Sequence, residues 1–200
     1  ADLCIYSATK FLGGFSDLIA GAVIGRDAAL MKTIKARRAL FGNILPPDEC
    51  WMLDGRLPTV VLRMTRASKN AQRIAEALHQ SALAKKKIAT LYYPTLFTDP
   101  DQIRIRDQQC DFPGSLLSID LKGGKQAAFE LLRHLRISRN AVSLGGVETL
   151  ACHPKTTTHS GVPAAELQQA GITDGLVRVS VGIEDWRDLL ADFEQALDKV

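Results

Sequence analysis

The sequence predicts an α/β protein, and three features indicate this class. Short apolar runs of strand type alternate with amphipathic helical patterns from about residue 87 onward. Of the 200 residues, 46% are hydrophobic and 24% are charged, which is typical of a soluble globular domain. This length is sufficient for a sizeable core. The 25 basic and 22 acidic residues leave a net charge of +3, which argues against disorder and against strong electrostatic binding of nucleic acid.

The sequence also bears on the cellular compartment. No apolar run approaches the roughly 18 residues of a membrane span, and the first residues lack the basic and apolar regions of a signal peptide. The four cysteines lie far apart and form no C-x-x-C pair, so we expect reduced thiols. We therefore expect a cytoplasmic protein whose partners include neither a membrane nor a nucleic acid.

The first quarter of the chain predicts two strands around a single lysine. A strand-type run at 3–6 is followed by a polar, glycine-rich turn at 7–14 and by a second apolar run at 18–24. Asp27 is then a candidate N-cap for a helix that continues to about Leu40. The basic residues of this helix are expected to form a solvated face.

Two helices and an alternating region are predicted after Gly42. Pro46-Pro47 begins a short helix, and Pro58 can occupy the first turn of a long helix whose apolar residues continue to Leu78. We place the boundary between two domains here, so that residues 1–56 belong to one domain and residues 57–200 to the other. Beyond the long helix, the expected elements are strands at 88–93, 115–121, 140–144 and 176–181, with helices around 127–135 and 186–197. The segment Gly145–Gly161 is expected to be a long functional loop.

Lys10 is the first candidate for chemistry. It follows a predicted strand among small hydroxyl residues, and a lysine whose pKa is lowered there can form a Schiff base. An ordinary surface lysine is the alternative. Ser7 and Thr9, two residues apart, can place two hydroxyls on one face and bind a phosphate, or they can form local capping bonds in a turn.

The whole segment Ser7–Gly21 is more specific than its parts. It reads SATKFLGGFSDLIAG and resembles the pyridoxal-phosphate attachment motif of the Cys/Met metabolism enzymes, the family of cystathionine γ-synthase, the cystathionine lyases and methionine γ-lyase. The resemblance implies that the cofactor is pyridoxal 5'-phosphate, that Lys10 carries it as a Schiff base, and that the hydroxyls of Ser7 and Thr9 contact its phosphate. Phe15 stands where histidine is common in the family.

A second match lies in the long loop. The segment Ala141–Leu150, AVSLGGVETL, with the later His153-Pro154, resembles the family's Ser-Leu-Gly-Gly segment and its sequel. The resemblance implies that Ser143 lies beside the reactive lysine and the substrate. Without the family, Cys152, His153 and His159 could suggest a metal, but their spacing fits no usual zinc pattern, so we expect no metal site.

The third match is the segment Gly175–Asp185, which contains Arg178 in a run of valines. An arginine there must face water on an edge strand or have an anionic partner, because an unpaired buried guanidinium is too costly. The segment resembles the family's late strand, and this implies that Arg178 binds the α-carboxylate of the substrate. The planar guanidinium can bind a carboxylate with two parallel hydrogen bonds.

The three matches occur in the family's order and cover the chain from end to end. They imply the aspartate-aminotransferase fold (fold type I of the pyridoxal-phosphate enzymes), with 1–56 as the C-terminal part of the cofactor-binding large domain and 57–200 as the small α/β domain. The family's acidic partner of the pyridine nitrogen and its ring-stacking tyrosine precede the lysine. We therefore expect residue 1 to lie inside a longer polypeptide that forms a homodimer or homotetramer.

The resemblance implies an activity on a small molecule, an amino acid. We expect a carbon–sulfur lyase of the methionine γ-lyase type, which performs α,γ-elimination to a 2-oxo acid, ammonia and a thiol. Val142, before Ser143, supports this choice, because cystathionine γ-lyases resembling the animal enzymes carry an acidic residue there. The alternatives are γ-replacement by a cystathionine γ-synthase or homoserine-ester sulfhydrylase, a cystathionine lyase, and a noncatalytic remnant or interaction domain.

Overall fold

The computed structural model describes residues 1–200 of the chain. The chain divides into two compact units, an N-terminal unit, Ala1–Val61, and a C-terminal unit, Leu62–Val200. None of the helices combines the length and the apolar character needed to cross a membrane.

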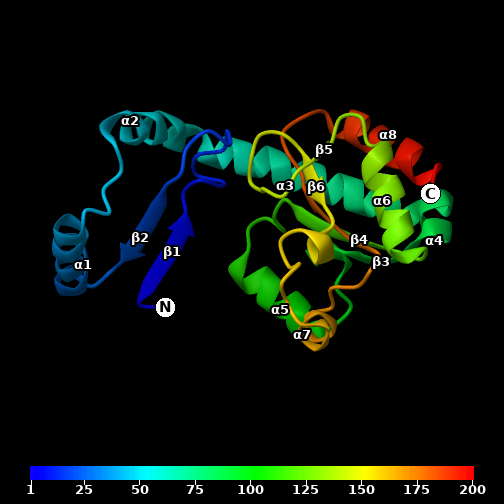
Figure 1. Ribbon diagram of the computed structural model, residues 1–200, viewed down its shortest axis with the longest axis horizontal. Coiled ribbons are helices and arrows are strands. Elements are labelled where there is room, and N and C mark those ends of the chain that lie inside the picture. The colour runs from blue at the N-terminus through cyan, green and yellow to red at the C-terminus, as the bar shows by residue number, and fades with distance from the viewer. The chain divides into compact units, whose positions relative to one another are not determined.

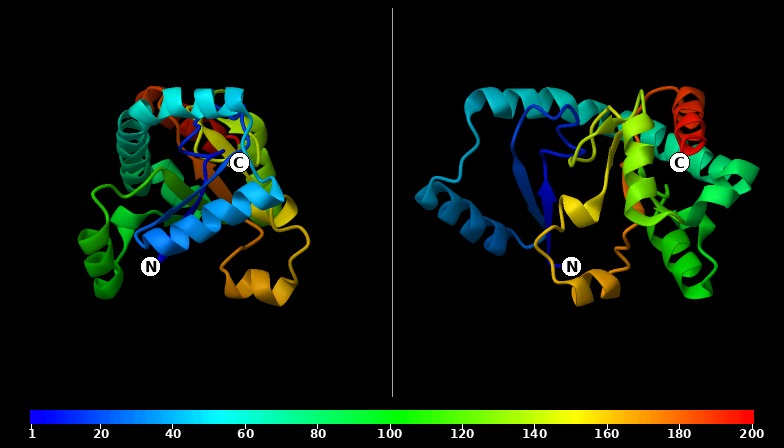
Figure 2. Two further views of the ribbon diagram at one scale, coloured as in Figure 1. Left: turned by 90° about the vertical axis from the view of Figure 1, so that its left-hand side faces the viewer. Right: turned by 45° about the vertical axis from the view of Figure 1, so that its right-hand side comes forward.

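The N-terminal unit begins with two antiparallel strands, β1 (Leu3–Ser7) and β2 (Gly21–Gly25), in a two-stranded sheet. They lie side by side in both views of Figure 2 and pair from Leu3 opposite Gly25 to Ser7 opposite Gly21. The second strand begins later than the predicted residue 18. The cause is Ala20, whose backbone N–H and C=O bind Thr9 instead of continuing the ladder.

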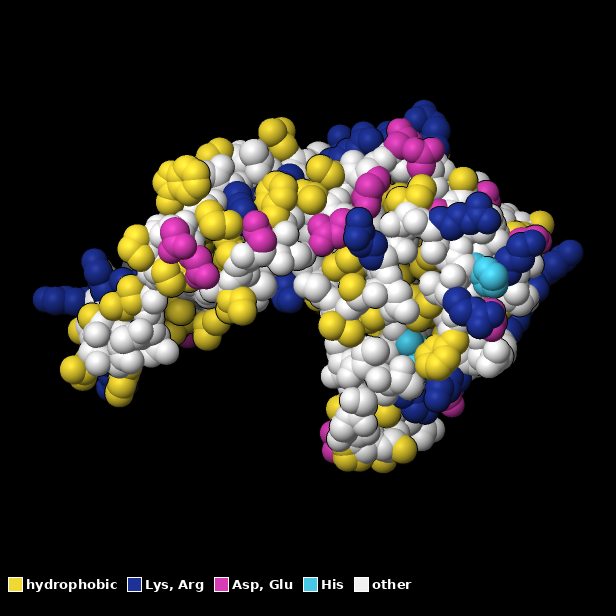
Figure 3. Space-filling view, turned by 45° about the horizontal axis from the view of Figure 1, so that its top comes forward, with side chains coloured by type: hydrophobic (Ala, Val, Ile, Leu, Met, Phe, Trp, Pro, Cys, Tyr) yellow, Lys and Arg dark blue, Asp and Glu magenta, His cyan; other side chains and the backbone are white.

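Two helices follow in this unit, α1 (Ala28–Phe41) and α2 (Pro47–Arg56), and a 3-10 turn, η1 (Leu57–Thr59), comes after them (Figure 1). The predicted cap of α1 is confirmed, because the Asp27 carboxylate accepts hydrogen bonds from the N–H groups of Ala29 and Leu30 at 2.8 and 2.9 Å. The helix ends at Gly42, whose φ of 74° is the left-handed conformation that favours glycine. Neither helix contains a buried residue, and hydrophobic side chains are visible on the surface of this unit (Figure 3).

The C-terminal unit contains a five-stranded sheet in the order β3-β4-β7-β6-β5. All neighbouring strands are antiparallel except β5 and β6, which are parallel. The strands are β3 (Ile88–Tyr92), β4 (Leu116–Leu121), β5 (Arg139–Asn140), β6 (Leu150–Cys152) and β7 (Leu176–Ser180). Strand β7 therefore lies in the interior of the sheet, with β4 on one side and β6 on the other.

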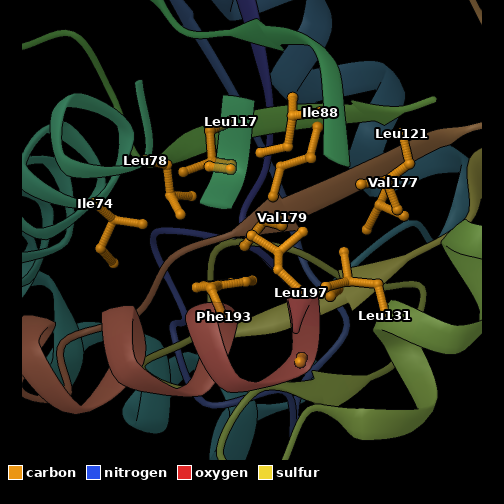
Figure 4. Packing of buried hydrophobic residues seen from close by; sticks show 14 of the residues in the cluster. Ile74, Leu78, Ile88, Leu117, Leu121, Leu131, Val177, Val179, Phe193 and Leu197 are labelled. Carbon is orange, nitrogen blue, oxygen red and sulfur yellow. The ribbon is translucent and has the colours of Figure 1, made fainter. Parts of the chain in front are cut away.

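Helices cover one face of this sheet and form the core with it. The core-forming helices are α3 (Val60–Gln80), α4 (Ala82–Lys87), α6 (Gly124–His134) and α8 (Trp186–Leu197). Figure 4 shows their apolar side chains, such as Ile74 and Phe193, directed toward Leu117 and Val179 of the strands. Because side chains alternate along a strand, Arg178 and Ser180 of β7 point to the opposite face from Val177 and Val179.

The predicted α/β class is confirmed, but two parts of the pattern differ from the prediction. The strand expected at 140–144 ends at Asn140, because the carbonyls of Val142 and Ser143 bind Arg178 rather than a strand. The segment Gly145–Gly161, expected as one long loop, contains β6 and the turn η3 (Pro154–Thr156), and the short helix α7 (Ala164–Gln169) follows it.

Three helices were absent from the prediction: the short α4 and α7, and a third one, α5. Helix α5 (Pro100–Gln109) begins at the N-cap Asp99, whose carboxylate accepts from the N–H groups of Asp101 and Gln102. It buries no residue, so its sequence carries no apolar stripe of helical period. A short turn, η2 (Pro94–Leu96), precedes it.

Candidate active site

Lys10 lies in a tight turn directly after β1. The Lys10 N–H donates to the carbonyl of Ser7 at 3.1 Å, and the N–H groups of Gly13 and Gly14 donate to the carbonyls of Ala8 and Lys10, each at 2.7 Å. A Cβ atom on Gly13 would lie 2.8 Å from the Ala8 oxygen, and Gly14 has a φ of 79°. Both glycines are therefore needed for a turn that leaves the Lys10 side chain half-buried.

The structure brings the two candidate hydroxyls next to this lysine. Ser7 is exposed at the end of β1, and Thr9 is half-buried in the turn. The Thr9 hydroxyl accepts a hydrogen bond from the Ala20 N–H at 2.9 Å and donates to the Ala20 carbonyl at 3.3 Å. Thr9 thus ties the turn to Ala20, the residue before β2, through bonds that span 11 positions.

Arg56 of α2 reaches the segment that follows this turn. Its two terminal nitrogens donate to the two carboxylate oxygens of Asp17 at 2.5 and 2.7 Å, and its guanidinium lies 4.9 Å from the ring centre of Phe15. The hydrogen bond from Arg56 holds the pKa of Asp17 below its usual range. This pair was not predicted, because its residues lie 39 positions apart and no local pattern indicates it.

Arg178 lies in the C-terminal unit on the interior strand β7, opposite Ser118 of β4 and Cys152 of β6. The edge-strand alternative is therefore wrong. The Nη2 of Arg178 donates to the carbonyls of Val142 and Ser143 at 2.8 and 2.9 Å, and the buried Nε of Arg178 has no hydrogen-bond partner. A half-buried guanidinium with an unpartnered N–H can accommodate an anionic ligand.

The loop with Ser143 lies against this arginine, so the structure brings Val142, Ser143 and Arg178 together. Val142 is 53% exposed, whereas Ser143 is half-buried. Gly145 follows with a φ of 78°, and its N–H donates to the hydroxyl of Ser180 at 2.9 Å. Lys10, Ser7 and Thr9 belong to the N-terminal unit.

A polar network that the sequence analysis missed holds the other end of this loop. Thr149 donates to the Glu184 carboxylate through its N–H at 2.6 Å and through its hydroxyl at 2.9 Å. The same hydroxyl accepts from the N–H of Gly182 at 2.9 Å. A Cβ on Gly182 would lie 2.2 Å from the Val147 carbonyl oxygen, so only glycine allows this approach.

His153 is part of the fold of the C-terminal unit. Its side chain is buried, and its ring nitrogens form hydrogen bonds with the Thr156 hydroxyl at 2.8 Å and the Asp174 carbonyl at 3.0 Å. The Nδ1 of His159 forms a hydrogen bond with the hydroxyl of Thr158 at 2.8 Å. No group of three or more His, Cys, Asp and Glu side chains is arranged to hold a metal ion.

Comparison with known proteins identifies the family. The model of the Cys/Met metabolism PLP-dependent enzymes matches residues 1–198. The chain belongs to this family. The L-methionine gamma-lyase of Fusobacterium nucleatum subsp. nucleatum is 41% identical over 200 residues, which are 100% of this chain and 49% of that protein. The cystathionine beta-lyase of Bacillus subtilis is 37% identical over 199 residues, which are 100% of this chain and 50% of that protein.

Solved structures of the family agree with this assignment. Cystathionine gamma synthase from Xanthomonas oryzae pv. oryzae matches with a TM-score of 0.92 and 36% identity over 100% of this chain and 50% of that chain. The methionine gamma lyase CalE6 from Micromonospora echinospora matches with a TM-score of 0.88 and 35% identity over 99% of this chain and 51% of that chain. The predicted aspartate-aminotransferase fold is thereby confirmed. The chain spans about half the length of the curated relatives it matches.

The residues around Lys10 fit the cofactor of the Cys/Met metabolism family. Pyridoxal phosphate presents an aldehyde and a phosphate, and the turn offers a primary amine with hydroxyls one and three residues before it. Gly13 and Gly14 allow the backbone of this turn to pack closely on itself, because neither residue carries a Cβ atom. The individual roles of Ser7, Thr9 and Lys10 in binding remain predictions.

Proposed function

We propose that this chain is the part of a pyridoxal-phosphate-dependent carbon–sulfur lyase that carries the cofactor lysine and the substrate-binding arginine. The reaction proposed is that of a methionine γ-lyase, in which methionine gives a 2-oxo acid, ammonia and a thiol. The observation that carries the proposal is the Arg178 guanidinium, whose unpartnered Nε lies beside a loop that begins with the apolar Val142. Curated relatives named L-methionine gamma-lyase, 39% to 41% identical to this chain, support it.

The proposed roles in the N-terminal unit follow from the turn after β1. When bound, pyridoxal phosphate acts as an electron sink that makes the hydrogen on the substrate Cα acidic. The Lys10 amine holds the cofactor and then, once free, takes the proton from Cα. The hydroxyls of Ser7 and Thr9 bind the phosphate, and the Arg56–Asp17 pair fixes the chain that follows the turn.

The proposed roles in the C-terminal unit concern the substrate. Arg178 binds the α-carboxylate with the N–H groups that the two loop carbonyls at Nη2 leave, among them its Nε. Ser143 orients the substrate from the adjacent loop. The apolar side chain of Val142 suits a thioether methyl better than the charged end of cystathionine, although a contact of methylene size changes selectivity by only about 1–3 kcal/mol.

The proposal extends to domains, assembly and location. Residues 1–56 are the C-terminal part of the cofactor-binding large domain, and residues 57–200 are the small domain. The full enzyme is a cytoplasmic homodimer or homotetramer, as the family resemblance implies. The two compact units, Ala1–Val61 and Leu62–Val200, support the proposed division into domains.

A second candidate is γ-replacement or the cleavage of cystathionine. The TM-score of 0.92 to a cystathionine gamma synthase and the 37% identity to a cystathionine beta-lyase favour it. It differs from the first candidate in the charge that the distal end of the substrate carries. The residue at position 142 is therefore the point at which the two candidates can be separated.

The test is a substrate comparison on the polypeptide that contains this chain, supplied with pyridoxal phosphate. We expect 2-oxo acid and thiol from methionine at a higher kcat/KM than from cystathionine. Val142→Glu should shift this preference toward cystathionine by about tenfold, and Val142→Ile, which stays apolar, should leave it in place. Faster turnover of cystathionine, or of a homoserine ester with an added thiol, would favour the second candidate.

A further inference from the structure

Ser180 is buried on the same face of β7 as Arg178, two residues away, and its side chain contacts the loop that carries Ser143. Its hydroxyl oxygen accepts the hydrogen bond from the Gly145 N–H at 2.9 Å, and the residue is 1% exposed. Its position links the strand that carries the arginine to the loop that the arginine contacts.

We propose that Ser180 is a positioning residue for substrate binding, an inference that rests on the proposed function. By holding the Gly145 peptide, Ser180 keeps the carbonyls of Val142 and Ser143 at the guanidinium of Arg178. These carbonyls occupy Nη2 and so fix the direction of the guanidinium plane. The buried Nε is then left for the carboxylate of the amino acid.

The backbone around Gly145 explains why an anchor matters there. Gly145 has a φ of 78°, and Gly146 follows it. Two consecutive glycines give this part of the loop more backbone freedom than residues with a side chain would. Without the hydroxyl of Ser180, the Gly145 N–H would have to find another acceptor or remain unpaired in a buried place. The loop would then move until the N–H is solvated.

The distal end of the loop is anchored independently. The Ile183 N–H donates to the Val147 carbonyl at 2.9 Å, and Thr149 is held by Glu184 through two hydrogen bonds. Asn70 of α3 in turn donates to the carbonyls of Gly182 and Glu184 at 3.0 and 2.8 Å. Loss of the Ser180 hydroxyl should therefore loosen residues 142–146 while the rest of the sheet and its connections persist.

The predicted kinetic effect follows from this division. Ser180 does not touch the reacting atoms, so its loss should weaken the binding of the carboxylate and leave the chemical step unchanged. We expect Ser180→Ala to raise KM by about 5- to 10-fold for every amino acid substrate, with kcat within about twofold of wild type. The same change should increase the exchange rate of the Gly145 amide hydrogen by about the same factor, with the amides of β6 unaffected.

The variants are chosen to separate positioning from packing. Ser180→Ala and the near-isosteric Ser180→Cys both weaken the acceptor, whereas Ser180→Thr retains a hydroxyl and should restore KM. Ser138→Ala is the matched control, because Ser138 is also a buried serine of this unit and its hydroxyl has no hydrogen-bond partner. If Ser180→Ala does not fold, Ser180→Cys serves for the same comparison.

The experiment measures hydrogen exchange of residues 142–147 and steady-state kinetics on the polypeptide that contains this chain. Faster exchange at Gly145 with a raised KM, rescued by Ser180→Thr and absent in Ser138→Ala, supports the inference. Unchanged exchange, an unchanged KM or a loss confined to kcat in Ser180→Ala overturns the inference. The proposed function stays intact in that case, provided that the wild-type protein turns over its substrate. A wild-type protein without turnover of any amino acid overturns both the proposed function and the role of Ser180 in it.

Discussion

The two units of the chain reach a defined fold by different means. In the N-terminal unit, α1 and α2 bury no side chain, and Phe41 and Trp51 are 74% and 78% exposed. In the C-terminal unit, Phe193 is fully buried in a core shared by four helices and the sheet. Within this chain, hydrogen-bonded caps and turns define the local structure of the first unit, whereas the second unit has a core of its own.

The same contrast applies to the residues that are predicted to bind the cofactor and the substrate. Lys10 is presented by a turn whose hydrogen bonds are local and whose glycines permit its geometry. Arg178 is presented by an interior strand and held by a loop more than 30 residues away in sequence, because its contacts with Val142 and Ser143 span 36 and 35 positions. Substitutions should therefore have unequal effects in the two units.

The largest difference is expected between two phenylalanines. Phe193→Ala leaves a cavity in the core and should lower the free energy of unfolding of the C-terminal unit by about 3–5 kcal/mol. Phe41→Ala removes a side chain that is 74% exposed in the 200-residue chain, and it should change the free energy of unfolding of this chain by less than about 0.5 kcal/mol. Urea denaturation can follow each unit separately, because Trp51 lies in one and Trp186 in the other. Equal effects of the two changes would contradict the comparison.

The next difference concerns two aspartates that cap backbone N–H groups. Asp192 is buried, and its carboxylate accepts hydrogen bonds from the N–H groups of residues 136–138. Asp192→Ala leaves these donors unpaired and should cost roughly 2–3 kcal/mol. Asp27→Ala removes the exposed cap of α1 and should cost about 1 kcal/mol. Thermal unfolding of the two variants tests the order, and a larger cost for Asp27 would reverse the account.

A smaller effect is expected at Tyr93, whose hydroxyl donates to the carbonyls of Gly114 and Ser68 at 2.8 and 3.2 Å. Burial raises the pKa of Tyr93 well above its usual range, so the folded state keeps the proton that the unfolded state loses. The stability from this group is complete below about pH 10 and is lost as the pH rises further.

Tyr93→Phe should therefore cost about 0.5–1.5 kcal/mol at pH 7 and should reduce the loss of stability above pH 10. The neighbouring Tyr92 is 47% exposed, and Tyr92→Phe is the matched control. Urea denaturation at several pH values measures both variants. The same alkaline loss of stability in wild type and Tyr93→Phe would show that Tyr93 is not its source.

The smallest effect belongs to the ion pair of the N-terminal unit. The hydrogen bond from Arg56 lowers the pKa of Asp17, so the pair stabilises this unit above the usual aspartate pKa of about 3.9. This contribution is lost as the pH falls through the lowered pKa. Arg56→Met should return the pKa of Asp17 toward its usual value in an NMR titration, and Arg37→Met on α1 should leave it in place. An Asp17 pKa that stays unchanged in Arg56→Met would refute the pair.

The sequence predicted those parts of the molecule that depend on local signals. Asp27 and Gly42 marked the ends of α1, and the alternation of valines marked β7. The turn of Lys10 was recognisable because its residues are contiguous. The apolar period of α3 and α8 likewise reflects a single buried face.

The missed parts depend on contacts between distant residues. Thr149 and Glu184 are 35 positions apart, and Arg56 and Asp17 are 39 positions apart, so no local pattern indicates either pair. The early end of the strand predicted at 140–144 has the same origin, because Arg178 takes the carbonyls that a strand would use. The pair formed by Ser180 and Gly145 is a further example.

The central claim is that Lys10 is the cofactor lysine of this chain, and one measurement tests it most directly. The polypeptide that contains the chain is incubated with pyridoxal phosphate and reduced with borohydride, which converts an imine on lysine to a stable amine, and the labelled peptides are identified by mass spectrometry. Lys10→Arg and the matched Lys32→Arg in α1 are treated in the same way. The account predicts stoichiometric label on Lys10, lost in Lys10→Arg and retained in Lys32→Arg. Label on Lys32, Lys35 or the cluster at 85–87 with Lys10 unmodified would contradict it.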